Sequence, residues 1–325
     1  MRIVWVSFAP LDKHAGKLTS SMASVRYRML VPAAAMADCD CKVMHLTAGA
    51  NRRTLMERFR GADAVVLGKL LGGEREAALA FELVAGLKEA KVAVLADYSD
   101  DHFSSAARGE AYRALANAVD RVVASTPGLA EVIAQHSPVP VSVVTDPVEG
   151  ARGEPRAPEA TPLRLLWFGH PSNLDTLQYA LPQLHGLPVS VTLMTAPGAG
   201  AEQLGVRFRP WSTQAAFDEL RQCDAVFIPS NPYDPRKAVK SPNRFTESVW
   251  AGRFVLAHPL PAYQELADFG WVGEDLGEGL RWLAGHRDEA LERVRRGQAA
   301  IAGRFSPSAV AGAWKEAILL ATGRA

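Results

Sequence analysis

The sequence predicts an α/β protein built from two doubly wound, Rossmann-like domains. Short runs rich in β-branched and aromatic residues alternate with amphipathic stretches along the whole chain, and the runs carry few charges. Such runs are typical of parallel strands that helices bury on both faces. A segment rich in proline and glycine near the middle divides the alternation in two, and 325 residues suffice for about two domains.

The first half of the alternation predicts one sheet with its covering helices. Right-handed crossovers between successive parallel strands make such a sheet doubly wound. We expect strands at residues 3–7, 43–46, 64–67, 92–96, 121–124 and 142–144, and helices at 24–37, 53–60, 74–90, 106–118 and 128–135.

The second half repeats the pattern after a linker without apolar periodicity. We expect strands at residues 163–168, 189–193, 206–208, 225–228 and 254–257, and helices at 174–184, 213–222, 242–251, 276–285, 288–303 and 307–321. The predicted organisation is an N-terminal Rossmann-like domain at 1–150, a linker at 151–162, a second Rossmann-like domain at 163–304 and a C-terminal helix at 305–325.

The net charge argues against a nucleic-acid partner, and the distribution of charge predicts a basic patch. With 36 Lys and Arg against 35 Asp and Glu, the formal net charge is +1, so we expect no nucleic-acid partner. Residues 1–60 hold ten Lys and Arg but only four Asp and Glu, which predicts a basic patch suited to an anionic substrate or a membrane surface.

Three cysteines are too few for a disulfide framework, which indicates a reducing compartment. The first apolar run breaks at Pro10 and does not resemble a signal peptide, and no stretch approaches the roughly 20 apolar residues that cross a bilayer. We therefore expect a cytoplasmic protein, at most in peripheral contact with the inner membrane face. Asp38-Cys39-Asp40 lies between a predicted helix and strand, which favours a turn, and we expect no metal site.

The densest chemistry follows the predicted strand at 225–228. A polar loop there carries Arg236, Lys237 and Lys240 and leads to Ser241 and Pro242. Serine suits the N-cap of a helix and proline its first position. Basic residues thus precede a helix N-terminus at the carboxyl edge of a parallel sheet. Such a place favours the binding of an anion.

The helix that follows has polar side chains on one face. Asn243 and Glu247 are four residues apart and so lie on the same side, and Gly252 ends the helix. A carboxylate in this position can accept hydrogen bonds from a ribose diol. The segment therefore fits a nucleoside diphosphate, although a solvated basic loop before an ordinary helix would give the same pattern.

This segment resembles the donor site of glycosyltransferases with the GT-B fold. KSPNRFTE at 240–247, with WAGRFVLA at 250–257, is similar to their signature, in which Lys, Asn and Arg lead to a Glu on one helix, followed by Gly and an apolar strand. Weaker similarity covers most of the chain, at residues 120–126, 144–148, 166–170 and 307–320.

The resemblance implies two Rossmann-like domains facing a cleft, with the C-terminal helix crossing back to the N-terminal domain. The N-terminal domain would hold the acceptor and the second domain a nucleotide-diphosphate-sugar co-substrate, with no other cofactor. The implied reaction is metal-independent transfer of a sugar to an acceptor hydroxyl, as in the synthesis of cell-surface polysaccharides, glycolipids and other glycoconjugates. The implied donor contacts are Gly169, His170, Arg236, Lys240, Asn243, Arg244 and Glu247.

Two positions depart from the large retaining group of these enzymes. Val239 stands where the first of two glutamates would lie, and residues 170–173 replace the Arg and Lys that follow the first strand of the donor domain. Arg236, Lys240 and Arg244 could supply the missing charge. Retention or inversion at the anomeric carbon stays open, as do the base and the sugar of the donor.

A cluster of three carboxylates and a histidine directly follows the predicted strand at 92–96. Open α/β sheets bind ligands at the carboxyl ends of their strands. Crowding of Asp97, Asp100 and Asp101 predicts a raised pKa for at least one of them, and His102 is expected to titrate near neutrality. We expect Asp100, Asp101 or His102 to orient or deprotonate the acceptor hydroxyl.

The basic loop between the first strand and the first helix lies at the same predicted edge. In the GT-B resemblance it faces the acceptor, and its charge would suit an anionic or lipid-linked acceptor. Arg26 and Arg28 fit either this surface or ion pairs with the acidic cluster. A nucleotide-sugar epimerase and a non-catalytic two-lobed binding protein are the alternative functions, and an assay for transfer to an added acceptor would separate them.

Overall fold

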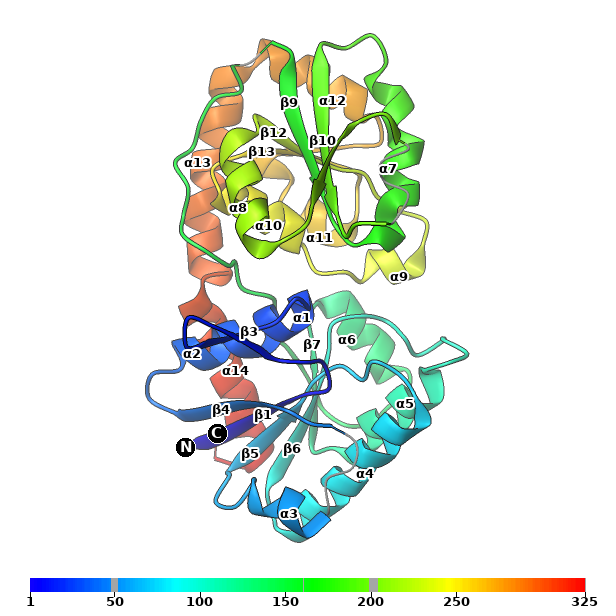
Figure 1. Ribbon diagram of the computed structural model, residues 1–325, viewed down its shortest axis with the longest axis vertical. Helices are drawn as coiled ribbons and strands as arrows, with labels where there is room; N and C mark the ends of the chain where they lie inside the picture. Colours follow the sequence, from blue (N-terminus) through cyan, green and yellow to red (C-terminus); the bar gives the residue numbers. More distant parts are fainter. Residues whose placement is uncertain (48–51, 160, 199–203, 325) are drawn as a thin grey trace. The chain divides into compact units, whose positions relative to one another are not determined.

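The computed structural model describes residues 1–47, 52–159, 161–198 and 204–324. The chain forms two compact units (Figure 1). Unit 1 comprises Met1–Pro147, Val239–Ser241 and Phe305–Ala325, and unit 2 comprises Val148–Ala238 and Pro242–Arg304. Each unit holds a six-stranded parallel sheet with helices on both faces, which confirms the predicted fold class.

The sheet of unit 1 has the strand order β4-β1-β5-β6-β7-β8. Its strands are β1 (Arg2–Ser7), β4 (Asp40–His45), β5 (Ala64–Leu67), β6 (Ala93–Tyr98), β7 (Arg121–Ala124) and β8 (Val141–Val143). Its helices are α1 (Ala23–Val25), α2 (Val31–Ala35), α3 (Arg52–Glu57), α4 (Glu74–Glu89), α5 (Gly109–Ala118), α6 (Pro127–Ala134) and α14 (Pro307–Thr322).

Successive residues of each strand in unit 1 point to opposite faces of the sheet. Val4 and Val65 share a core with α4 and α5, whereas Trp5 and Val66 share a second core with α14. The Trp314 ring of α14 meets the Trp5 ring edge to face, with centroids 4.7 Å apart. The predicted C-terminal helix therefore completes the core of the N-terminal sheet.

The first predicted helix of unit 1 is interrupted by a π-helical turn, Arg26–Leu30, labelled η1. Pro32, in α2, has no N–H to donate to the carbonyl of Arg28, so the regular i to i−4 ladder is broken here. The turn buries the Arg28 side chain, which is 1% exposed.

An antiparallel hairpin of β2 (Asp12–His14) and β3 (Lys17–Thr19) also departs from the prediction. Its turn residues Ala15 and Gly16 both have positive φ, at 47° and 78°. Two-residue hairpin turns usually contain Asn-Gly or Asp-Gly. Ala15-Gly16 lacks that sequence signal, so the sequence of this segment predicts a loop and not a hairpin.

The sheet of unit 2 has the order β11-β10-β9-β12-β13-β14. Its strands are β9 (Leu163–Phe168), β10 (Val189–Thr195), β11 (Arg207–Pro210), β12 (Ala225–Ile228), β13 (Phe254–Ala257) and β14 (Trp271–Val272). Its helices are α7 (Leu174–Ala180), α8 (Thr213–Gln222), α9 (Pro235–Ala238), α10 (Asn243–Trp250), α11 (Pro261–Gln264), α12 (Leu276–Gly285) and α13 (Arg287–Arg304), with short 3₁₀ turns η2 (Pro171–Asn173), η3 (Leu181–Leu184) and η5 (Ala267–Phe269).

The helices of unit 2 cover both faces of its sheet. Leu177 of α7 shares a core with Trp167 and Phe227 of the strands. Figure 1 shows α7 on the opposite side of this sheet from α8 and α10. The two-residue strand β14 and the one-turn helix α9 are absent from the prediction, because neither is long enough to show a hydrophobic period.

No helix among the residues described is both long and apolar enough to cross a membrane.

Candidate functional site

The helix α10 carries three of the donor candidates, Asn243, Arg244 and Glu247. Gly252, with φ of 79°, follows its last turn, as predicted. The predicted cap is wrong. Pro242 occupies the N-cap position, with no side-chain hydrogen bond to the first turn, whereas the Ser241 hydroxyl donates to Asp146 Oδ2 at 2.7 Å.

Arg244 lies beside the turn that follows β9. A Cβ atom on Gly169 would stand 3.5 Å from Arg244 Nη1 and 3.3 Å from the Trp167 ring, so glycine allows the main chain and the guanidinium to approach. Nη1 of Arg244 is buried and has no hydrogen-bond partner among the described residues. A buried, unpaired guanidinium nitrogen is costly, and an anion that contacts it would remove that cost.

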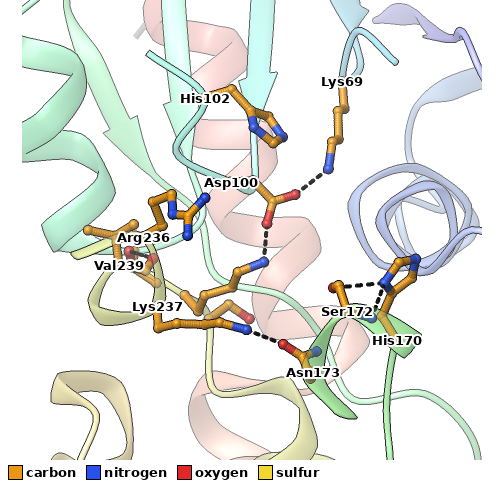
Figure 2. A network of polar contacts seen from close by, with 12 residues as sticks. Lys69, Asp100, His102, His170, Ser172, Asn173, Arg236, Lys237 and Val239 are labelled. Carbon is orange, nitrogen blue, oxygen red and sulfur yellow. Dashed lines mark hydrogen bonds and ion pairs between the residues drawn. The ribbon is translucent and has the colours of Figure 1, made fainter. Parts of the chain in front are cut away.

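His170 is exposed and caps the turn η2, where its Nδ1 accepts a hydrogen bond from the Ser172 N–H at 3.2 Å. In Figure 2 its ring stands next to Ser172, and the Lys237 ammonium donates to the Asn173 side-chain carbonyl. This last contact fixes α9 against the turn before α7. Lys237 and Asn173 were not among the predicted donor contacts, although both lie beyond strand ends, where ligands of such sheets bind.

Arg236 of α9 is less available than Arg244 to bind an anion. Its guanidinium forms an ion pair with Asp234 at 3.0 Å, and its side chain is 68% exposed. The hydrogen bond from Arg236 lowers the pKa of Asp234. The carboxylate therefore already neutralises the charge that the sequence assigned to the donor.

Lys240 belongs to unit 1 and not to unit 2. The three residues 239–241 are each held by a side-chain hydrogen bond within unit 1. Thr126 Oγ1 donates to the Val239 carbonyl at 2.8 Å, Lys240 Nζ to Asp100 Oδ1 at 2.5 Å, and Ser241 Oγ to Asp146. Asn243, Arg244 and Glu247 belong to unit 2.

Asp100 lies between two ammonium groups, those of Lys69 and Lys240 (Figure 2). Burial alone would raise the pKa of Asp100, but Lys240 and Lys69 outweigh that effect and hold the pKa well below its usual range. Of the three carboxylates for which at least one raised pKa was predicted, Asp97 has a raised pKa and Asp100 a lowered one. Lys69 follows β5. Because ligands of open α/β sheets bind at the carboxyl ends of the strands, this position could have identified Lys69 as a candidate site residue.

His102 and Asp101 have different surroundings in the same loop. The Asp101 carboxylate accepts a hydrogen bond from the Phe103 N–H at 3.0 Å and so holds the turn. His102 lies against the Tyr112 ring, with centroids 5.1 Å apart. Burial, and then the charge of Lys69, lower the pKa of His102, so its imidazole is neutral at pH 7.

Arg28 occupies the centre of a buried ionic cluster. Its guanidinium donates to Asp97 Oδ1 at 2.7 Å, to Asp146 Oδ1 at 2.9 Å and to the Val144 carbonyl. Burial would lower the pKa of Arg28, but the two carboxylates raise it instead. Burial raises the pKa of Asp97, whereas Arg28 opposes that rise, so crowding by Asp100 and Asp101 is not the cause.

The structure thus assigns the two arginines that the sequence left open. Arg28 is the partner of the acidic cluster, and Arg26 donates to the carbonyls of Ser20 and Ser21. Both are buried and so do not contribute to the predicted basic patch.

Asp38, in the sequence Asp38-Cys39-Asp40, forms an ion pair with Lys315. Among the residues described, no group of three or more His, Cys, Asp or Glu side chains could hold a metal ion.

Comparisons with known proteins match the fold. No family model and no curated protein matches the sequence. The Anabaena protein Alr3699/HepE, solved with UDP, is 14% identical, with a TM-score of 0.70 over 97% of this chain and 99% of its own. An alpha-glucosyltransferase solved with UDP is 8% identical, with a TM-score of 0.71 over 99% of this chain and 100% of its own.

A glycosyltransferase from Rickettsia africae is 10% identical, with a TM-score of 0.68 over 100% of this chain and 99% of its own. TarM, at 11% identity and a TM-score of 0.62, covers 82% of this chain, which spans only 57% of the TarM length. These likenesses establish that the chain has the GT-B fold.

Proposed function

We propose that the protein is a glycosyltransferase that moves a sugar from a nucleotide-diphosphate sugar to an acceptor hydroxyl. Unit 2 would bind the donor and unit 1 the acceptor. The structures of the Anabaena protein and of the alpha-glucosyltransferase contain UDP or UDP-glucose, which makes UDP the first donor nucleotide to test.

The observation that carries this proposal is the buried, unpartnered Nη1 of Arg244 beside the Gly169 turn. Arg244 lies on the same helix as Glu247, and the N-cap residue of that helix makes no side-chain hydrogen bond to its first turn. The Arg244 guanidinium and the positive end of the helix dipole would stabilise the negative charge that accumulates on a nucleoside diphosphate as it leaves. Glu247, one turn further along, would accept hydrogen bonds from the ribose hydroxyls.

For the acceptor, the best candidate base in unit 1 is His102. A neutral imidazole can accept the proton of an attacking hydroxyl, whereas Asp100 is engaged by two lysines and Asp101 by the main chain. The exposed hairpin of β2 and β3 carries Lys13, His14 and Lys17. The charge of the two lysines supports an anionic acceptor, such as a lipid-linked one.

Replacing Arg244 by methionine should weaken UDP binding by about ten- to a hundredfold, because a hydrogen bond to a charged group is lost. Uridine, which lacks the diphosphate, should bind nearly as well as before. Glu247→Gln should weaken both ligands by roughly tenfold, because it alters a ribose contact. Isothermal titration calorimetry measures all four affinities.

The control for Arg244→Met is Arg295→Met, which makes the same change at an arginine of α13 that is 58% exposed. Unchanged UDP affinity in Arg244→Met and Glu247→Gln, with the fold intact, would place the donor site elsewhere. Formation of an epimer of the donor sugar without transfer to any added acceptor would favour the epimerase alternative.

Transfer should persist in excess EDTA. Arg244 and the N–H groups at the start of α10 supply positive charge where a divalent cation acts in other enzymes. The measurement is the rate of nucleotide release with and without chelator. Loss of activity in EDTA that Mg²⁺ or Mn²⁺ restores would contradict this expectation.

A further inference from the structure

Unit 2 contains a cavity of about 500 Å³ that none of the seven donor candidates lines. It opens between α7 and the loops that follow β12, β13 and β14, and we call it the α7 pocket. Asp175 and Tyr179 of α7, Tyr233, His258 and Glu274 supply its main chemistry. Glu247 and Arg244 of α10 are not among the residues that line the α7 pocket.

His258 is a buried polar residue of the α7 pocket, with 4% of its surface exposed. Its Nδ1 lies 3.0 Å from the Ser230 nitrogen and 2.7 Å from the Ser230 oxygen, so the main chain occupies this side of the ring. Its buried Nε2 has no hydrogen-bond partner among the described residues. Such a group is rare in a folded protein, and a ligand in the cavity that His258 lines would satisfy it.

The state of Nε2 depends on which tautomer Ser230 selects. If Nδ1 accepts from the Ser230 N–H, Nε2 donates; if Nδ1 donates to the Ser230 carbonyl, Nε2 accepts. A hydroxyl group can donate or accept and so pairs with either tautomer. A ligand rich in hydroxyl groups therefore meets the requirement of His258 in both cases.

The charge of the α7 pocket opposes phosphates. The lining includes the carboxylates of Asp175 and Glu274, and no lysine or arginine is among the described residues that form it. An anion would be repelled by both carboxylates and would find no cation. Ionised carboxylates accept hydrogen bonds from hydroxyl groups without any change in charge.

Two tyrosines add flat apolar surfaces to the α7 pocket. Tyr179 is 76% exposed and Tyr233 is 82% exposed, values that are high for large aromatic side chains. Tyr233 Oη lies 3.4 Å from Glu274 Oε1, which keeps the ring next to a carboxylate. Exposed rings of this kind offer a face to a ligand that is apolar on one side and polar at its edge.

We propose that the α7 pocket binds a neutral saccharide, with its sugar ring against Tyr179 or Tyr233 and its hydroxyl groups on His258, Asp175 and Glu274. The site is additional to the proposed donor site and stands on its own lining. If the chain is a transferase, this site would hold part of a glycan acceptor or product away from the reacting hydroxyl. If it is not, the site remains a carbohydrate-binding site.

The test uses the full chain and three neutral trisaccharides, of glucose, N-acetylglucosamine and mannose, each at millimolar concentration. Saturation-transfer NMR detects binding, and a titration gives the dissociation constant. At least one trisaccharide should bind, and Tyr233→Ala and Tyr179→Ala should each weaken it by about three- to tenfold. Both tyrosines are exposed, so these variants should fold. Leu320→Ala, at an exposed residue of α14, is the control.

His258→Gln should weaken the same trisaccharide further, while UDP affinity stays unchanged in all these variants. Absence of binding by every neutral trisaccharide would overturn the proposal, as would binding that the tyrosine and histidine variants leave intact. Binding of a glucosamine trisaccharide alone would show that the carboxylates select a cation. Displacement of the trisaccharide by UDP, with weaker UDP binding in Tyr233→Ala, would make the α7 pocket part of the donor site.

The two proposals fail separately. Arg244→Met and Glu247→Gln report on the donor site, whereas Tyr233→Ala and His258→Gln report on the α7 pocket. Loss of UDP binding in the first pair with intact trisaccharide binding would support both assignments.

Discussion

Replacing Arg28 by methionine is expected to lower the free energy of unfolding by about 3–5 kcal/mol, the cost of removing one partner from a buried ion pair. The Asp97 and Asp146 side chains are 3% and 4% exposed, and Arg28 contacts both. Methionine would fill much of the volume but leave two buried carboxylates without their cation. Urea denaturation, followed by tryptophan fluorescence, measures the change.

A triple variant separates charge from packing in this cluster. Arg28→Met combined with Asp97→Asn and Asp146→Asn removes all three charges, so we expect it to recover part of the stability lost in Arg28→Met alone. Arg60→Met, at an exposed arginine of the same unit, should unfold at the wild-type urea concentration. If Arg28→Met also unfolds there, the cluster contributes nothing to stability.

Replacing His102 by alanine should lower the turnover of sugar transfer by about 10²–10⁴-fold, the usual effect of removing a general base. Since the base must be neutral, activity should fall as the pH drops through the pKa of His102. Burial and Lys69 lower the pKa of His102, so the midpoint of this fall in activity should lie below the usual 6.5. Initial rates across a pH series test both statements.

Asp101→Asn is the matched comparison within the same loop. Because Asp101 accepts a main-chain hydrogen bond that asparagine can also accept, we expect near-wild-type turnover in that variant. UDP affinity should be unchanged in His102→Ala, because His102 belongs to unit 1 and the donor candidates on α10 to unit 2. Wild-type turnover in His102→Ala would show that the loop has no acid–base role.

The strands were the most predictable elements. The predicted strands at 64–67, 121–124, 163–168, 225–228 and 254–257 agree with the structure at both ends. The strands at 64–67, 225–228 and 254–257 are fully buried, continuous apolar runs, and the other two each contain a single arginine. The hairpin of β2 and β3 was missed for the opposite reason, because most of it is exposed and buries no apolar face.

The candidate site was predictable where it depends on local spacing. Asn243, Arg244 and Glu247 lie within five consecutive residues of one helix, so the local sequence alone places them together. The pairing of Asp100 with Lys69 and Lys240 joins residues up to 140 positions apart, which no local period records. Likewise, no local period records that Arg28, and not Arg26, pairs with Asp97, 69 positions away.

The place of α14 in the core of unit 1 affects the order in which the chain can fold during synthesis. One face of the first sheet, with Trp5, is covered by side chains of α14, including Trp314 and Ile318. Ribosomes extend a chain at about 5–20 residues per second, and domains generally fold as they emerge. Unit 2 can therefore complete its core while one apolar face of the unit 1 sheet is still uncovered. Unit 1 can thus complete its core only after α14 has left the ribosome.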